Sequence, residues 1–305
     1  MLKAIPTIFS LFLIISCNRM DKQSTFLFEH GGIKREYILY VPDNIQPKAP
    51  LIFVLHGLGS TSSHIREYSQ MDIVAKKYGF VVCYPQGTES SQNSIHTKKG
   101  SSFWNVGYDI HMNEYVNDVS FLKSLARYLQ EKYNLDPRKT FCSGMSNGGD
   151  MSYLLGCEAA EVFKAIASVT GCMMAWIYES CANNPIPVFQ IHGTKDDITH
   201  YNGDMKNKDK WGAYLGVETT IDFWIDQNKS LGSIIDTIGF THKSDSSYII
   251  SKKYINGINK NEIWFYKVVN GGHDWVQKPL IEDFNTSEEI WRFFENFISL
   301  NNLDT

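Results

Sequence analysis

The sequence predicts an α/β protein whose central sheet is mostly parallel and is covered by helices on both faces. Short apolar runs rich in β-branched residues alternate along the chain with segments that repeat apolar residues at helical spacing. Several of these runs stop at His–Gly or Pro, as buried strands often do. Hydrophobic residues make up 43% of the 305-residue chain, which excludes a mainly disordered protein.

The expected elements follow in order. The strands are short apolar runs, at 26–29, 35–41, 51–55, 80–84, 140–143, 165–169, 187–191, 248–254 and 262–268. The first two should pair antiparallel around the turn His30–Gly31–Gly32. The helices repeat apolar residues at helical spacing, at 63–78, 118–133, 148–158, 217–227 and 286–300. The polar segment 88–102 is expected to be a surface loop.

The first 24 residues are expected to lie outside the folded body. Lys3 gives a positive start, residues 4–15 are almost wholly apolar, and the chain turns polar directly after Cys17. This run is shorter than the roughly 20 apolar residues that a spanning helix needs. We therefore interpret it as part of a signal peptide. Ile14–Ile15–Ser16–Cys17 resembles the lipobox of bacterial lipoproteins, which implies lipidation of Cys17. An ordinary signal peptide with a chance cysteine is the alternative.

We therefore expect a signal peptide over 1–16, a tether over 17–24 and one folded domain over 25–305, since no repeat or linker divides the rest. The chain would be exported and held at a membrane through the lipid only. The net charge of −4 and the absence of a basic block argue against nucleic acid as a partner.

The remaining cysteines are odd in number, so at least one thiol stays free or pairs between chains. Cys83 and Cys142 lie inside expected strands and are interpreted as buried, inert thiols. Cys172 and Cys181 flank a short stretch, which makes them a candidate disulfide pair in an oxidising compartment. A Cys157–Cys181 bond is equally compatible with the sequence. No CxxC or HExxH pattern supports a metal site.

A first chemical signal is Gly144–Met145–Ser146–Asn147–Gly148, a G-x-S-x-G pattern between an expected strand and an expected helix. Such a tight strand-to-helix turn presents the serine hydroxyl clear of the sheet. The pattern alone is weak, since chance matches across all serines are expected at roughly one in seven. Its place between a strand and a helix strengthens the interpretation.

Serine is a poor nucleophile without a base, and the base needs a carboxylate to orient it. Downstream, Asp196 and Asp197 follow an expected strand, and His273 follows a later one among glycines. This is the order Ser, Asp, His of α/β-hydrolases. We expect Ser146, His273 and one of the two aspartates, with Asp196 preferred, to form a catalytic triad. Such a triad needs no metal or organic cofactor.

The tetrahedral oxyanion of acyl transfer requires two N–H donors. We expect them to be the backbone N–H groups of Leu58, in the loop after strand 51–55, and of Asn147, directly after the serine. His56 and His192 each begin a His–Gly turn and are interpreted as structural.

Several motifs together resemble the polyhydroxybutyrate depolymerase and feruloyl esterase group of α/β-hydrolases, in carbohydrate esterase family one. The resembling segments, which cover nearly everything from residue 35 onward, are His56–Gly57–Leu58–Gly59, Tyr84–Pro85–Gln86–Gly87, Trp104–Asn105, Asn117–Asp118–Val119, Tyr133–Asn134–Leu135–Asp136, Gly144–Gly149, His192–Gly193–Thr194–Lys195–Asp196, Gly271–Gly272–His273–Asp274–Trp275 and Ile290–Trp291–Arg292–Phe293–Phe294. Two departures are Asn117, where members commonly carry aspartate, and Leu58–Gly59–Ser60, which replaces Cys–Gly–Gly.

The resemblance implies an α/β-hydrolase fold, Asp196 as the triad acid, and hydrolysis of feruloyl or acetyl esters of plant polysaccharides. Depolymerisation of polyhydroxybutyrate, a polyester, is the alternative activity. Trp104 and Trp275 are expected to line the substrate site, although either is also compatible with the core. A serine peptidase and a non-catalytic binding lipoprotein are weaker alternatives, the latter because fold alone does not imply function.

Overall fold

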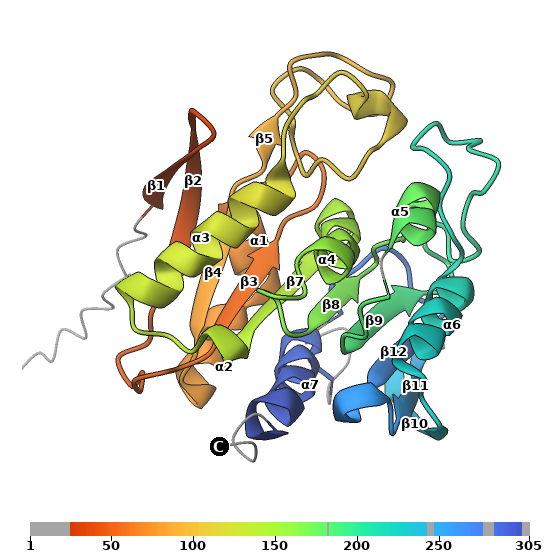
Figure 1. Cartoon of the computed structure of the whole chain (residues 1–305). Helices are drawn as coiled ribbons and strands as arrows, with labels where there is room; N and C mark the ends of the chain where they lie inside the picture. Colours follow the sequence, from red (N-terminus) through yellow and green to blue (C-terminus); the bar gives the residue numbers. More distant parts are fainter. Residues whose placement is uncertain (1–24, 182, 243–246, 277–283, 301–305) are drawn as a thin grey trace, which may run out of the picture.

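The computed structural model describes residues 25–181, 183–242, 247–276 and 284–300, and within them a ten-stranded sheet dominates (Figure 1). Its order is β1-β2-β4-β3-β7-β8-β9-β12-β11-β10. The strands are β1 (Thr25–His30), β2 (Ile33–Tyr40), β3 (Leu51–Leu55), β4 (Val81–Pro85), β7 (Thr140–Met145), β8 (Ile166–Val169), β9 (Val188–Gly193), β10 (Gly232–His242), β11 (Ser247–Ile255) and β12 (Ile263–Val269).

The centre of the sheet is parallel and its two edges are antiparallel. Strands β4, β3, β7, β8, β9 and β12 pair in parallel, each with its neighbour in that order. The β1–β2 hairpin and the β10–β11 hairpin extend the two edges with antiparallel pairs. The expected leading hairpin and the mostly parallel sheet are therefore confirmed.

Helices cover both faces because the central strands are apolar on both sides. The helices are α1 (Ser62–Ser69), α2 (Met71–Tyr78), α3 (Asp118–Lys132), α4 (Asn147–Glu158), α5 (Ala175–Ser180), α6 (Val217–Asn228) and α7 (Thr286–Leu300). In β3, Phe53 packs into the same core cluster as α3, α4 and α6, whereas Val54 packs with α1, α2 and α7. Figure 1 views the sheet from the side of α3, α4 and α6.

The structure differs from the sequence expectation in four elements. The helix expected over 63–78 is two helices, because Gln70 takes a left-handed conformation (φ 53°) and its N–H caps α1 at Arg66. Strand β10 was not expected, since it lies at the sheet edge and Ile234 and Ile235 are both exposed rather than alternating. Helix α5 has only six residues, too few for a periodic pattern. The loop 88–102 contains one strand of a short hairpin, β5 (Thr88–Glu89) with β6 (Ser102–Phe103).

Residues 1–24, including Cys17 and the expected signal peptide and tether, lie outside the described residues. None of the helices that the structure describes is both long enough and apolar enough to cross a bilayer.

The disulfide joins Cys157 to Cys181, so of the two candidate pairings the Cys172–Cys181 bond is wrong and its alternative is right. Helix α5 turns the chain back after Cys172, which brings Cys181 to the carboxyl end of α4. Cys172 instead remains a buried free thiol, as do Cys83 and Cys142. The bond therefore ties α5 to the helix that follows the G-x-S-x-G turn.

We expect peptide mapping of the oxidised protein to recover Cys157 linked to Cys181. The Cys157→Ser/Cys181→Ser variant should lose about 3 kcal/mol of unfolding free energy, because the bond restricts a loop between residues 24 apart in the unfolded chain. Urea unfolding measures this loss. Dithiothreitol should lower the stability of the wild type to that of the variant and leave the variant unchanged. A recovered Cys172–Cys181 peptide would contradict the assignment.

Candidate active site

Ser146 occupies a strained turn between β7 and α4. Its backbone has φ 55° and ψ −124°, a conformation that L-residues rarely adopt. Glycines make the turn sterically feasible: a Cβ on Gly148 would lie 2.5 Å from the carbonyl oxygen of Leu55 and 2.7 Å from that of His56. A Cβ on Gly144 would collide with the backbone of Gly148. The sequence expectation of a serine on a tight strand-to-helix bend is thus reproduced in the backbone.

Asp196 and His273 are brought together by adjacent parallel strands. Asp196 follows β9 and His273 follows β12, and these two strands pair directly. The Nδ1–H of His273 donates to Oδ2 of Asp196 at 2.8 Å. That bond fixes the tautomer, so Nε2 is the nitrogen left to act on a serine.

The carboxylate of Asp196 is buried and held by further donors. Its Oδ1 accepts the N–H groups of Ile198 at 2.9 Å and Thr199 at 2.8 Å. Nε2 of His192 lies 3.2 Å from Oδ2. Burial opposes ionisation, but the hydrogen bonds and charges of His192 and His273 outweigh it and hold the pKa of Asp196 well below its usual range.

The neighbouring acidic residues are placed elsewhere. Asp197 is exposed, whereas the hydroxyl of Tyr68 donates to Asp274. His192 accepts from Nε2 of Gln190 at 2.9 Å and donates to the carbonyl oxygen of Thr199 at 2.8 Å, which supports the loop that carries Asp196. Of Asp197, Asp274 and His192, only His192 lies within 4 Å of the carboxylate of Asp196 as a charge partner.

Ser146 and His273 open into a single cavity of about 380 Å³, here called the catalytic pocket. This is within the size range of small-molecule sites. The lining residues are Leu58, His96, Tyr108, Ser146, Cys172, Ile198, Thr199, Trp211, Tyr214 and His273.

Aromatic rings form one wall of the catalytic pocket. His96 stacks on Trp211 with ring centroids 3.7 Å apart, and its Nε2–H donates to the carbonyl oxygen of Asp209 at 2.6 Å. Trp211 also contacts the ring of Tyr108, at 5.4 Å between centroids. These three wall residues were missed in the sequence, where they lie in polar loops without a motif.

The two expected oxyanion donors lie beside the serine. The loop after β3 passes so close that a Cβ on Gly57 would be 3.3 Å from Cβ of Ser146, and Leu58 follows it. Asn147 is the first residue of α4, where a backbone N–H has no partner within the helix. Within the described ranges, no acceptor is found for the N–H of Leu58. A helix amino terminus also favours negative charge.

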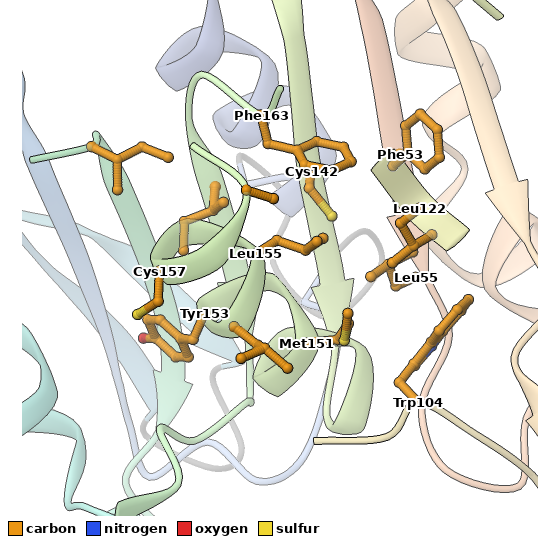
Figure 2. Packing of buried hydrophobic residues seen from close by; sticks show 14 of the residues in the cluster. Phe53, Leu55, Trp104, Leu122, Cys142, Met151, Tyr153, Leu155, Cys157 and Phe163 are labelled. Carbon is orange, nitrogen blue, oxygen red and sulfur yellow. The ribbon is translucent and has the colours of Figure 1, made fainter. Parts of the chain in front are cut away.

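Trp104 does not line the catalytic pocket, so its expected contact with substrate is corrected. It is fully buried, and Figure 2 shows its ring near Leu55 and Met151. Its Nε1–H donates to the carbonyl oxygen of His56 at 2.9 Å, and its backbone forms two hydrogen bonds with the side-chain amide of Asn147. Trp104 therefore holds the loop after β3 against the start of α4.

Trp275 does not line the catalytic pocket either, so its expected contact with substrate is also corrected. It is fully buried in the core cluster on the side of α7, and its Nε1–H donates to Oγ of Ser287 in α7 at 3.1 Å. Although it lies two residues after His273, its ring points into the core. It anchors the loop that carries the histidine.

A buried carboxyl group lies behind the catalytic pocket. Asp150, in the first turn of α4, accepts the backbone N–H of Cys172 at 2.6 Å and the hydroxyl of Tyr108. Burial raises its pKa to about 7, while the hydrogen bonds from Tyr108 and Cys172 and the charge of His273 oppose the rise. No motif in the sequence indicated a role for this residue.

The strand order, the serine on its strained turn, and the Asp196–His273 pair after β9 and β12 define the fold of an α/β-hydrolase. Solved structures show the same fold: an acetyl xylan esterase from Aspergillus awamori superposes with a TM-score of 0.59 at 16% identity, over 90% of this chain and 99% of that one. The chain belongs to the family described as Esterase PHB depolymerase, whose model matches residues 35–198, more than half of its length.

Curated relatives are similar over part of the chain. A bifunctional acetylxylan esterase/xylanase of Neocallimastix patriciarum is 28% identical over 179 residues, 58% of this chain and 24% of that one. A probable feruloyl esterase C of Aspergillus oryzae is 28% identical over 190 residues, 61% of this chain and 64% of that one. The matches thus span less than two thirds of these relatives.

A fluorophosphonate probe should label Ser146, because it reports a serine activated by a base. Ser146→Ala should abolish labelling, and Asp196→Asn should slow it on the order of 10⁴-fold through loss of the productive histidine tautomer. Asp197→Asn is the matched control and should stay within about twofold of wild type, since Asp197 is exposed. Gel fluorescence against time gives the rates. A greater loss for Asp197→Asn would reverse the assignment of the acid.

Asp150 should make folding stability depend on pH. Its folded pKa of about 7 exceeds the ordinary 3.8, so the unfolded chain releases the proton first. The free energy of unfolding of the wild type should therefore fall, relative to Asp150→Asn, as the pH rises from about 4 to about 7, and level off above. Urea unfolding at several pH values measures the difference. A difference that is constant across this range would contradict the assignment.

Proposed function

We propose that the protein is a serine carboxylic-ester hydrolase with Ser146, His273 and Asp196 as its triad. The observation that carries the proposal is one pocket lined by both a serine on a strained turn and a histidine bound to a buried carboxylate. Membership of an esterase family and the names of the curated relatives support it.

In the proposed mechanism, Nε2 of His273 takes the proton of Ser146 as Oγ attacks the ester carbonyl carbon. The imidazolium that forms is stabilised by Asp196, whose carboxylate stays ionised because its pKa is low. The same nitrogen then returns the proton to the departing alcohol. Water, activated by His273, cleaves the acyl-enzyme and restores Ser146.

The tetrahedral oxyanion is proposed to rest on the N–H groups of Leu58 and Asn147. Both are backbone donors beside the serine, and they require no reorganisation as charge develops. Trp104 supports this pair, because it bonds both the side chain of Asn147 and the loop that precedes Leu58. A fully buried tryptophan thus links the loop after β3 to the first residue of α4.

The substrates are proposed to be feruloyl or acetyl esters of plant polysaccharides, with feruloyl esters preferred. An acetyl group would leave most of a 380 Å³ pocket unfilled, whereas an aryl acyl group can lie against Tyr108 and Trp211. Relatives named as feruloyl and acetylxylan esterases support this choice.

An ester panel on purified protein tests the activity and the substrate together. The rate of ester hydrolysis should be higher on arabinoxylan fragments, measured as ferulate and acetate released, than on a polyhydroxybutyrate suspension, measured as clearing. Ser146→Ala should lower kcat on the order of a millionfold, leaving only binding and the oxyanion donors. Residual turnover within tenfold of wild type would contradict the nucleophile. Polyester clearing without ferulate or acetate release would reverse the substrate and leave the mechanism intact.

We also propose that the chain is exported and tethered through a lipid on Cys17, as its lipobox-like segment predicts. The Cys157–Cys181 disulfide supports an oxidising compartment. Labelling of cells with a radioactive fatty acid should mark the wild type and be lost in Cys17→Ser. An unlabelled wild type would indicate an ordinary signal peptide.

A further inference from the structure

Asp150 is a fully buried carboxyl group that the proposed proton transfer does not use. It lies four residues after Ser146, and its backbone N–H donates to the carbonyl oxygen of Ser146 at 2.9 Å in the first turn of α4. The ionisable groups that face it are Tyr108, Tyr153, Cys172 and His273. No lysine or arginine is among them within the described residues.

The two hydrogen bonds of Asp150 reach two walls of the catalytic pocket. Oδ1 accepts the backbone N–H of Cys172 at 2.6 Å, in the segment after β8. Oδ2 accepts the hydroxyl of Tyr108, in the loop after β6. Both partners line the catalytic pocket. One carboxyl group on the nucleophile's helix therefore holds two chain segments that approach it from different parts of the sheet.

A purely structural role explains this carboxyl group poorly. Burial of a carboxyl group without a cation costs free energy, and an apolar residue of similar volume is often at least as stabilising in the core. What the carboxyl group adds is geometry, because its two oxygens fix the hydroxyl of Tyr108 and the backbone at Cys172 relative to Ser146.

We propose that Asp150 is a positioning residue that sets the width of the catalytic pocket for bulky acyl groups. It acts through Tyr108 and Cys172 and does not touch the ester. The inference rests on the proposed esterase function, which supplies the acyl group. A small acyl group makes few contacts with these walls, so its reaction should depend little on Asp150.

The test compares kcat/KM for 4-nitrophenyl ferulate and 4-nitrophenyl acetate, which share a leaving group. In Asp150→Ala the ferulate-to-acetate ratio should fall about tenfold, since a misplaced wall disturbs only the acyl group that contacts it. Asp150→Asn should restore the ratio to within about threefold, because its oxygen can accept from Cys172 and its amide can donate to Tyr108. The ratio does not depend on the amount of folded enzyme.

Ser152→Ala is the matched control. Ser152 is also buried on α4, but its hydroxyl bonds Gly148 and approaches Cys142, neither of which lines the catalytic pocket. The ferulate-to-acetate ratio should be unchanged in this variant. An equal loss for both esters in Asp150→Ala, or a ratio that Asp150→Asn fails to restore, would overturn the inference.

Further measurements keep the inference separate from folding and from the proposed substrate. If Asp150→Ala does not fold, Tyr108→Phe replaces it: this variant keeps the ring and removes one hydrogen bond to Asp150, and an unchanged ferulate-to-acetate ratio would overturn the inference.

If the wild type cleaves acetate but not ferulate, the proposed substrate fails, and 4-nitrophenyl hexanoate takes the place of 4-nitrophenyl ferulate. If the wild type cleaves no ester, the proposed function fails, and crystal structures of Asp150→Asn and Tyr108→Phe test the positioning role. The pocket walls should stay in place in Asp150→Asn, which keeps both bonds, and should shift in Tyr108→Phe, which loses one. Walls that remain unmoved in both variants would overturn the inference.

Discussion

The close approach of α4 to the end of β3 is the contact on which the site depends. Gly148 lies against the carbonyl oxygens of Leu55 and His56, with no room for a side chain. This close approach goes with the strained, positive-φ conformation of Ser146, which directly precedes the first residue of α4. The strain at the serine is thus maintained by packing between two buried elements, not by the turn itself.

The acid and the base depend on a second constraint, the pairing of β9 with β12. These strands are far apart in sequence, yet their parallel register places the residues after them on one edge of the sheet. Asp196 is then fixed by the N–H groups of Ile198 and Thr199, and His273 by the burial of Trp275 in the core. Asp196 and His273 are therefore both held in place by the protein itself, as the proposed catalysis requires.

Sequence reasoning succeeded where a local pattern determines the structure. Strand β3 and helix α7 have the predicted bounds, because one is a continuous apolar run and the other has a strong helical period. It failed where contacts between distant parts of the chain determine the structure. Nothing local distinguishes Cys172 from Cys157 as the partner of Cys181, because the pairing depends on the reversal of the chain through α5.

The site was predicted unevenly for the same reason. Ser146, Asp196 and His273 were predicted from their order and their place after strands, and the structure places His273 Nδ1 2.8 Å from Asp196 Oδ2. Trp104 and Trp275 lie in segments that resemble the family and were expected to line the substrate site, although both are fully buried in the core. Trp211 and His96 lie in polar loops, and only the folded chain brings them together.

The division of the pocket between scaffold and loops has an evolutionary consequence. The proposed nucleophile, acid and base stand at the ends of buried strands, where substitution disturbs the core. The aromatic wall instead comes from long surface segments, in which Trp211 meets His96 from a separate loop. Such segments tolerate insertion and exchange. Descendants of one ancestral chain can therefore diverge in the esters they accept while they inherit the same reaction unchanged.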